Sequence, residues 1–531
     1  MPSATGAFSK QDIGGEILPI LTTGLYQDSL DALREYVQNA VDANSKDIEI
    51  VIDPDVASVS DTGTGMDART ARLAIRLGIS EKDPTKHVGF RGIGIYSGFN
   101  LCNTLEIYTK CKDGIEYMLQ FRFGEIRKAL SIEAERRRTG KPPQLFLEEL
   151  LSKNIAVTES NQNAIEDSGT KVLMRELVPD AYLRLQKWTT VENYLQQVVP
   201  LPFRDEFRFK QQIEKRFREA DYRIVPLTLQ IQHQREQIFR PYTNDIFSEE
   251  AKLKFFPIGT GSHKFGFAWV CINDRVVLPE QGLRGMLIKK AGFSIGTRAH
   301  LESYFKRPVF NRRVTGEVIV QHARLLPNAA RSDFEHNSVR QSFYEALARF
   351  ITTLSLWGNK IQQEGKAKAV LAEVNNEMVD MEACILRAGR DKDELIRLSV
   401  ELADAERRLK LHQDTLKTLG TEGLNGALSR IGICRKTIRN ALNETNQSRR
   451  KLEAAVAKLV SAKPASSTET LKPIEIRINT LAEALDNCGV RVPDEAATLI
   501  RRFEEEFIFT KIEPEPYKTM LTEFVAATED E

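Results

Sequence analysis

The sequence has 531 residues, of which 41% are hydrophobic and 28% are charged, and its formal net charge is +1. These values are ordinary for a folded chain of roughly two to four domains and exclude a disordered protein. A net charge this close to zero provides no overall attraction to nucleic acid or membrane, so any such contact would depend on local patches.

Targeting and covalent signals are absent from the sequence pattern. No apolar run approaches the roughly 20 residues that span a bilayer, and the first ten residues, MPSATGAFSK, lack the apolar core of a secretory signal. The six cysteines form no CxxC pair, which argues against structural zinc and a disulfide framework. We therefore expect a cytoplasmic protein without a membrane contact.

The first strong helix signal is LREYVQNAVDAN, within a helix predicted over 30–43. Its apolar face consists of Leu30, Leu33, Val37, Ala40 and Val41. Glu35, Asn39 and Asp42 lie at i, i+4 and i+7 on the opposite face. Taken alone, such a face is typical of a solvent-exposed helix.

A strand predicted at KDIEIVID is followed by a second at ASVSDTGTGMD, which runs into a glycine turn. Asp61 ends this second strand, and Gly63 and Gly65 allow a tight turn and close approach of a ligand. A buried aspartate accepts a hydrogen bond from an exocyclic amine, so Asp61 is a candidate for selecting adenine.

A helix predicted over 68–77 leads to HVGFRGIGIYSGF, a glycine-rich loop that opens another helix. Gly89, Gly92 and Gly94 have GxxGxG spacing, and backbone amides at a helix start suit a triphosphate. The spacing differs from a Rossmann fingerprint, and no GxxxxGK[ST] P-loop occurs. A glycine-rich loop alone is more often a turn than a phosphate site.

The remaining pattern predicts an α+β fold, with helices on one side of an antiparallel or mixed sheet. Strands are expected at TLEIYTK, EYMLQFRF and GTKVLMREL, with amphipathic helices near 125–168. A second α+β domain, 201–357, contains predicted strands at PLTLQIQ, FGFAWVCI and TGEVIVQHARLL. Region 358–531 is predicted to be helical or coiled coil, with helices over 359–418 and 427–460 interrupted at GTEGLNG, whose apolar faces must pair within or between chains.

In their order and separation, these motifs resemble the GHKL ATPase superfamily (gyrase, heat-shock chaperone, histidine kinase, MutL), and heat-shock protein 90 chaperones most closely. LREYVQNAVDA is similar to the helix carrying the catalytic base, DTGTGM to the adenine motif, VGFRGIGIYSGF to the end of the lid and GTKVLM to the last motif. The resemblance implies a Bergerat-type ATP-binding domain over 1–200, with ATP and Mg²⁺ as ligands.

The resemblance also implies roles for individual residues. Glu35 would activate water as a general base, Asn39 would hold Mg²⁺, and Asp61 would bind the adenine amine, with Met66 against the base. The turn would use Gly63 and Gly65, the phosphates would contact Gly89, Arg91, Gly92, Ile93 and Gly94, and Thr170 would reach adenine through water. Residues 67–88 would form a mobile lid with Lys82 as a lesser phosphate candidate, while Asp42 is either structural or supports the ligands from behind.

The resemblance further implies that a cation from the second domain reaches the γ-phosphate. Lys289 or Lys290 in GLRGMLIKKAGFSIG is the candidate, with Arg284 a lesser one. Equally, the two lysines are explained as a solvated charge pair on a strand edge. The stretch LLPNAARSDFE, residues 325–335, has the pattern of a loop with a specific role, but no mechanism for it follows from the sequence.

The expected function is that of an ATP-hydrolysing clamp, a homodimer that remodels or regulates an unknown protein client, as chaperones do. The alternative is a DNA-associated clamp similar to the MORC and MutL branches, in genome maintenance or defence against foreign DNA. A third possibility is an ATP-regulated scaffold that switches a partner protein. The basic run 430–451 is either a solvated helix face or a nucleic-acid contact.

Overall fold

The computed structural model describes residues 12–26, 28–85, 87–142, 144–261, 264–273, 278, 283–306, 308–388, 391–420 and 422–442. The chain divides into two compact units, Met1–Asn359 and Lys360–Glu531. This division lies close to the boundary expected after residue 357. The predicted α+β class is confirmed: the first unit combines sheets and helices, and the described part of the second is helical.

The larger sheet of the first unit has eight strands in the order β5-β4-β3-β6-β2-β1-β7-β8. All neighbours are antiparallel except β1 and β7, which are parallel. The strands are β1 (Ile48–Ile52), β2 (Val56–Asp61), β3 (Cys102–Lys110), β4 (Glu116–Arg122), β5 (Ile155–Glu159), β6 (Gly169–Leu177), β7 (Leu227–Ile231) and β8 (Gln234–Gln237). Three isoleucines of β1 point into the core in strict alternation, as the pattern predicts.

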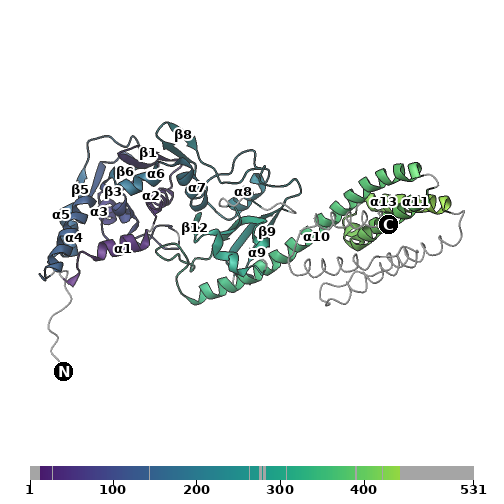
Figure 1. Cartoon of the computed structure of the whole chain (residues 1–531). Helices are drawn as coiled ribbons and strands as arrows, with labels where there is room; N and C mark the ends of the chain where they lie inside the picture. The colour runs from purple at the N-terminus through teal and green to yellow at the C-terminus, as the bar shows by residue number, and fades with distance from the viewer. Residues whose placement is uncertain are drawn as a thin grey trace, which may run out of the picture. The chain divides into compact units, whose positions relative to one another are not determined.

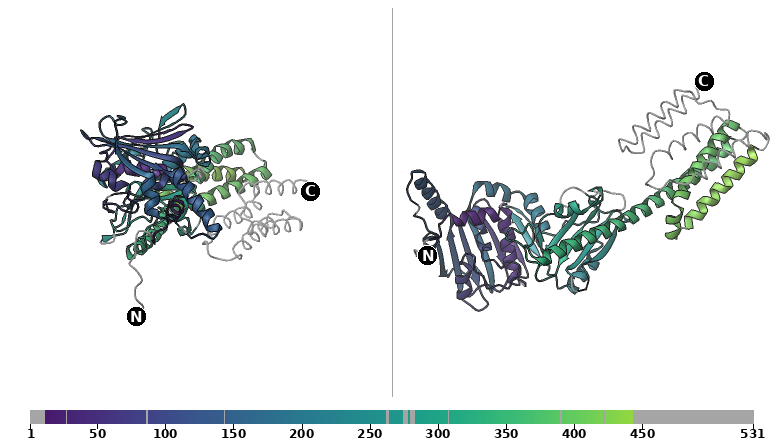
Figure 2. Two further views of the ribbon diagram at one scale, coloured as in Figure 1. Left: turned by 90° about the vertical axis from the view of Figure 1, so that its left-hand side faces the viewer. Right: turned by 90° about the horizontal axis from the view of Figure 1, so that it is seen from below.

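Helices cover one face of this sheet, as the strands above and the helices below show in the left view of Figure 2. They are α1 (Ile17–Leu25), α2 (Leu30–Asp42), α3 (Ala68–Ala74), α4 (Phe123–Arg138), α5 (Leu147–Asn154), α6 (Pro179–Leu185) and α7 (Trp188–Val198). The short 3₁₀ helix η2 (Gly94–Asn100) packs against α2. The glycine-rich segment therefore opens a 3₁₀ helix, and α3 ends three residues before the predicted end.

Helix α2, labelled in Figure 1, carries three of the candidate residues, Glu35, Asn39 and Asp42. Its five predicted apolar positions are all buried in the main core. Burial of such side chains contributes roughly 1.5–3 kcal/mol each relative to exposure, so the opposite face of α2 is held in a fixed orientation. The candidate carboxylates and carboxamide lie on that face.

The smaller sheet has five strands in the order β12-β11-β13-β10-β9, with β11 and β13 parallel. They are β9 (Lys252–Ile258), β10 (Gly266–Ile272), β11 (Gly285–Lys290), β12 (Phe293–Ile295) and β13 (Val314–Val320). The adjoining helices are α8 (Lys210–Glu219), η4 (Arg298–Tyr304), α9 (Pro308–Asn311) and the start of α10 (Ser338–Ala388). An aromatic cluster centred on Phe203, Tyr242 and Trp269 fills its core.

The boundary expected after residue 200 does not separate the two sheets. β7 and β8 follow it in sequence, yet β7 pairs with β1 in register from Ile48–Leu227 to Ile52–Ile231. The strand PLTLQIQ was predicted correctly, but its partner lies in the first sheet. A fragment that ends at residue 200 would leave the edge of β1 unpaired.

In the second unit, the later part of α10 packs against α11 (Lys392–Leu411), α12 (Gln413–Thr418) and α13 (Glu422–Ala441). The apolar faces of the described helices thus pair within the chain. An unpredicted helix start occurs where Asp391 accepts hydrogen bonds from the amides of Asp393 and Glu394. The break at GTEGLNG is shorter than predicted, because α13 begins at Glu422; the rest of the predicted helix, 443–460, lies outside the described residues.

Among the helices that the structure describes, none combines the length and the apolar character needed to cross a membrane.

Candidate functional site

A cavity of about 430 Å³ lies within the first unit, bounded by α2, the end of β2, the glycine-rich segment and residues 327–331. Its volume is within the usual range for a small-molecule site. The predicted residues that line it are Glu35, Asn39, Asp42, Asp61, Gly65, Met66, Lys82, Gly89, Arg91, Gly92, Ile93, Gly94 and Thr170. The fold therefore gathers three separate sequence motifs around one space.

Asp61 ends β2 and lies opposite Thr170 of β6 in the antiparallel register. Its Oδ1 accepts a hydrogen bond of 2.7 Å from the Gly63 amide. Burial raises the pKa of Asp61 to about 6, although the amides of Gly63 and Thr170 partly oppose that shift. A carboxylate held at a strand end beside an apolar wall suits an exocyclic amine donor.

Both turn glycines lie too close to other parts of the chain to accommodate a side chain. Gly65 has φ of +66°, and a Cβ there would lie 1.9 Å from the carbonyl oxygen of Lys110. A Cβ on Gly63 would lie 2.7 Å from the Cβ of Ala43, and Gly63 does not line the cavity. The turn is thus closely packed between α2 and β3.

Glu35 is 8% exposed and has one oxygen engaged within α2. Its Oε1 accepts from Gln38 Nε2 at 2.9 Å and from Arg34 Nη2 at 3.2 Å. Its Oε2 lies beside Gly94, where a Cβ would be only 2.8 Å away. Arg34 and Gln38, at i−1 and i+3, were not predicted; they fix the carboxylate so that the second oxygen faces the glycine-rich segment.

Asp42 ties the glycine-rich segment to α2. Its Oδ1 accepts from the Val88 amide at 2.8 Å, and its Oδ2 accepts from the Gly89 amide at 2.9 Å. Lys82 Nζ donates to Asp42 Oδ2 at 2.9 Å and to Asn39 Oδ1 at 3.2 Å. The open question about Asp42 is thereby answered in part: it holds two backbone amides and the Lys82 amine.

The glycines of this segment have different surroundings. Gly92 has φ of +67°, and a Cβ there would lie 2.4 Å from the carbonyl oxygen of Ile79. The Gly78 amide donates to the Gly92 carbonyl at 3.0 Å, which joins the segment to the predicted lid. On Gly89, a Cβ would lie 3.3 Å from Asn39 Oδ1. Gly89 and Gly94 therefore border side-chain oxygens of Asn39 and Glu35, whereas Gly92 packs against Ile79 in the predicted lid.

The loop 325–335 supplies a cation that the sequence did not identify. Arg331 lines the cavity, is 7% exposed and donates from Nη2 to the Val88 carbonyl at 2.6 Å. Its other terminal nitrogen, Nη1, is buried and has no hydrogen-bond partner. Burial lowers the pKa of Arg331 to about 10, and the charge of Glu35 opposes this shift. The guanidinium thus remains charged at neutral pH.

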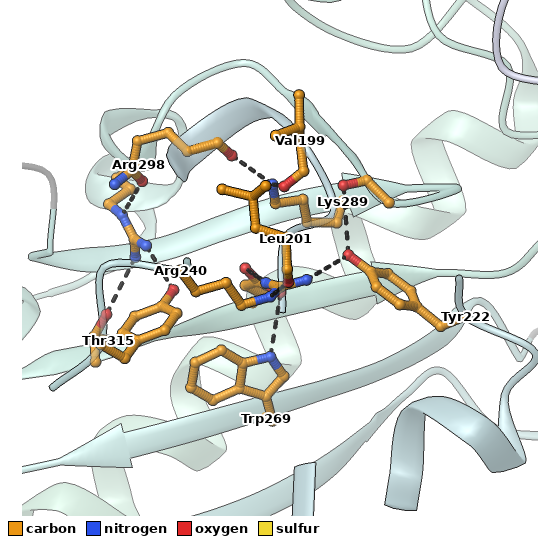
Figure 3. A network of polar contacts seen from close by, with 12 residues as sticks. Val199, Leu201, Tyr222, Arg240, Trp269, Lys289, Arg298 and Thr315 are labelled. Carbon is orange, nitrogen blue, oxygen red and sulfur yellow. Dashed lines mark hydrogen bonds and ion pairs between the residues drawn. The ribbon is translucent and has the colours of Figure 1, made fainter. Parts of the chain in front are cut away.

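This geometry does not support the prediction that Lys289 or Lys290 is that cation. Both belong to β11, and neither lines the cavity. Lys289 is fully buried and donates to the carbonyls of Gln197 and Val199, in a network with Arg240 and Arg298 (Figure 3). Burial lowers the pKa of Lys289 to about 7. Lys290 donates to the His322 carbonyl at 2.8 Å, so a solvated pair is excluded as well.

A buried cation that lines the cavity lies in the stretch LLPNAARSDFE, which the sequence had singled out without a mechanism. Arg331 lies within it and has φ of +55°, which is unusual for a residue other than glycine and signals a tightly determined turn. The buried position of an arginine cannot be read from a loop sequence, because it depends on the first-sheet residues that surround it.

A comparison with protein families matches the stretch of chain that contains α2, the end of β2 and the glycine-rich segment. Residues 26–145 match the family model described as histidine kinase-, DNA gyrase B- and HSP90-like ATPase. This match supports the GHKL ATPase superfamily, and ATP binding in general, for less than half of the chain. The predicted special closeness to heat-shock protein 90 receives no separate support from it.

One curated relative is a putative type II restriction enzyme, HgiDII, of Herpetosiphon aurantiacus, which is 30% identical over 165 residues. That segment covers 30% of this chain and only 24% of the relative. A crystal structure of the N-terminal domain of a DNA repair protein aligns with 65% of this chain and 98% of its own, at 14% identity and a TM-score of 0.39. At this TM-score the alignment has no bearing on fold or function.

Proposed function

We propose that this chain binds ATP in the cavity of the first unit and hydrolyses its γ-phosphate bond. The observation that carries the proposal is the convergence of Asp61, Glu35 and Arg331 on one cavity. They are, respectively, a half-buried acceptor for an amine, a fixed carboxylate with one oxygen free of side-chain donors, and a buried cation. Adenine recognition, water activation and stabilisation of phosphate charge need these three kinds of group.

In this proposal, Glu35 Oε2 accepts a proton from the attacking water. Gln38 and Arg34 hold the other oxygen, so the carboxylate does not have to reorient. Arg331 places positive charge where negative charge develops on the transferred phosphoryl group. Gly89 and Gly94 leave room for phosphate oxygens beside α2.

The residues present fit the predicted Mg²⁺. Asn39 Oδ1 and Asp42 Oδ2 are oxygen donors that already share one cation, the ammonium of Lys82. Oxygen ligands are those that magnesium prefers, so Asn39 would hold it with the phosphates. When bound, the metal would neutralise phosphate charge.

The macromolecular partner is the finer part of the proposal. Similarity to a putative type II restriction enzyme favours the DNA-associated alternative over a chaperone-like role. The basic run 430–451 would offer cations to such a partner, although its part beyond residue 442 lies outside the described residues. The homodimer stays a prediction.

The direct test measures phosphate release by the full chain with ATP. We expect release that needs Mg²⁺ and stops when the metal is removed with EDTA. A parallel gel shift with duplex DNA at about 50 and 200 mM salt should show binding that weakens steeply with salt. Absence of Mg²⁺-dependent release would contradict the ATPase proposal, and binding of no DNA at either salt concentration would return the choice to a protein client.

A separate prediction concerns Asp61. Asp61→Asn should abolish measurable ATP binding, because an amide presents a donor as well as an acceptor to the adenine amine. Since burial raises the pKa of Asp61 to about 6, the wild-type carboxylate is ionised above that pH and protonated below it. ATP affinity should therefore be constant above neutrality and fall as pH decreases through about 6.

Titration calorimetry at several pH values measures both effects. Asp47→Asn is a matched control, because this aspartate precedes β1 and does not line the cavity. A wild-type affinity that is independent of pH, together with normal binding by Asp61→Asn, would remove adenine recognition from Asp61.

A further inference from the structure

Two arginines cross between the glycine-rich segment and the loop 325–335 in opposite directions. Arg331 of the loop donates to the Val88 carbonyl at 2.6 Å. Arg91 of the glycine-rich segment donates from Nη2 to the Pro327 carbonyl at 2.8 Å and also pairs with the Glu335 carboxylate. The two segments are more than 230 residues apart in sequence, as the separation of 236 between Arg91 and Pro327 shows.

Backbone hydrogen bonds within the loop 325–335 join its base to its tip. Glu335 N donates to the Leu326 carbonyl at 2.8 Å, and Asn328 N donates to the Asp333 carbonyl at 2.8 Å. Nearer the tip, Arg331 N donates to the Asn328 carbonyl at 3.1 Å. Backbone hydrogen bonds therefore connect Glu335 at the base of the loop with Arg331 near its tip.

The base of the loop is also fixed to α10. Asp333 accepts from Tyr344 Oη at 2.5 Å and pairs with Arg340, and Tyr344 Oη lies 2.7 Å from His300 Nε2. These contacts hold the root of the loop in the second sheet region, but they do not reach the glycine-rich segment. Among the described residues, the polar contacts between the loop and the glycine-rich segment are those of Arg331 with Val88 and of Arg91 with Pro327 and Glu335.

We propose that Arg91 and Glu335 form a latch that positions Arg331 in the cavity. The inference rests on the proposed ATPase function and assigns both members of the latch as positioning residues. Arg91 was predicted to add charge toward the phosphates; here its guanidinium is directed to the loop. Because Arg91 lies between Gly89 and Gly92, the same segment that borders the phosphates governs whether the cation is in place.

The test compares Glu335→Gln with the wild-type full chain. The pair is partly exposed, at 31% for Arg91 and 40% for Glu335. Loss of such a pair should lower kcat about two- to fivefold at low salt, and the difference should shrink at about 0.5 M salt, where screening is strong. The Kd for ATP should not change. Glu345→Gln on the exposed face of α10 is the matched control.

A charge reversal separates positioning from general weakening of the structure. Glu335→Arg should lower kcat further, because two guanidinium groups then repel, and Arg91→Glu in the same chain should restore part of the loss. Hydrogen exchange should report faster exchange of the amides of 326–335 in Glu335→Gln and unchanged exchange in α2.

Two results would overturn the latch. One is an unchanged kcat in Glu335→Gln and Glu335→Arg. The other is a weaker Kd for ATP in Arg91→Lys without any effect of Glu335→Gln, which would make Arg91 a phosphate ligand. Failure of the ATPase proposal is distinguishable, since the wild-type chain would then release no phosphate from ATP in the presence of Mg²⁺.

Discussion

Replacement of Glu35 by alanine is expected to lower the rate of ATP hydrolysis by about two orders of magnitude or more while Mg·ATP still binds. Glu35 is proposed to accept the proton of the attacking water, and removal of a general base affects the reaction rather than the ground-state complex. The fold should persist, because Arg34 keeps its 2.9 Å ion pair with Asp31. Single-turnover phosphate release and calorimetric ATP binding measure the two quantities separately.

Glu49→Ala provides the control for this experiment. Glu49 lies on β1, pairs with Arg235 and does not line the cavity, so its removal should leave hydrolysis unchanged. Glu35→Gln tests the chemistry more narrowly, because it keeps the size of the side chain and removes its basicity. Normal hydrolysis by Glu35→Ala would exclude Glu35 as the base and with it the proposed mechanism.

The second large effect is expected for Arg331→Ala, which should lower kcat about 10²- to 10³-fold with little change in ATP affinity. The guanidinium is buried and charged, and only its Nη2 donates a hydrogen bond to a described residue, at the Val88 carbonyl. A cation from solvent therefore cannot readily take its place. Arg331→Lys should have intermediate activity, since a lysine amine keeps the charge but lacks the planar guanidinium, in which Nη2 bonds the Val88 carbonyl while Nη1 stays available to a phosphate.

Arg324→Ala is the matched control, because Arg324 is exposed, directly precedes the loop 325–335 and does not line the cavity. Near-ultraviolet circular dichroism of each variant checks that the packing of the first unit is retained. Wild-type turnover by Arg331→Ala would show that the loop has no part in the reaction. A loss equal in Arg331→Ala and Arg324→Ala would point to a general effect of the loop on stability.

The helix over 30–42 was predictable from sequence because its two faces separate completely. Five apolar residues recur at helical spacing, and the residues between them carry Glu35, Asn39 and Asp42. The glycine-rich segment borders the cavity and its contact with phosphates stays a prediction, but what the fold itself demands of particular glycines was not predicted. Gly63, Gly65 and Gly92 are required by nearby carbonyls and a methyl group, which are distant in sequence and become neighbours only in the fold.

The two lysines of β11 show most clearly what sequence alone cannot predict. Two adjacent lysines suggest exposed charge, yet every residue of β11 is buried. Both amines therefore donate hydrogen bonds to backbone carbonyls. Burial on both faces is a property of the layers above and below a strand. The strand alone does not specify it.

By itself, the sequence determined the α+β class, the position of α2, the end of β2 at Asp61 and the grouping of glycines at 89–94. Each of these follows from a local periodicity or from a residue type that few backbone conformations require. Tertiary structure alone decided that β7 completes the first sheet and that Arg331, rather than Lys289 or Lys290, lines the cavity. These features depend on pairings between segments far apart in the chain, whose energies come from surfaces that are not neighbours in sequence.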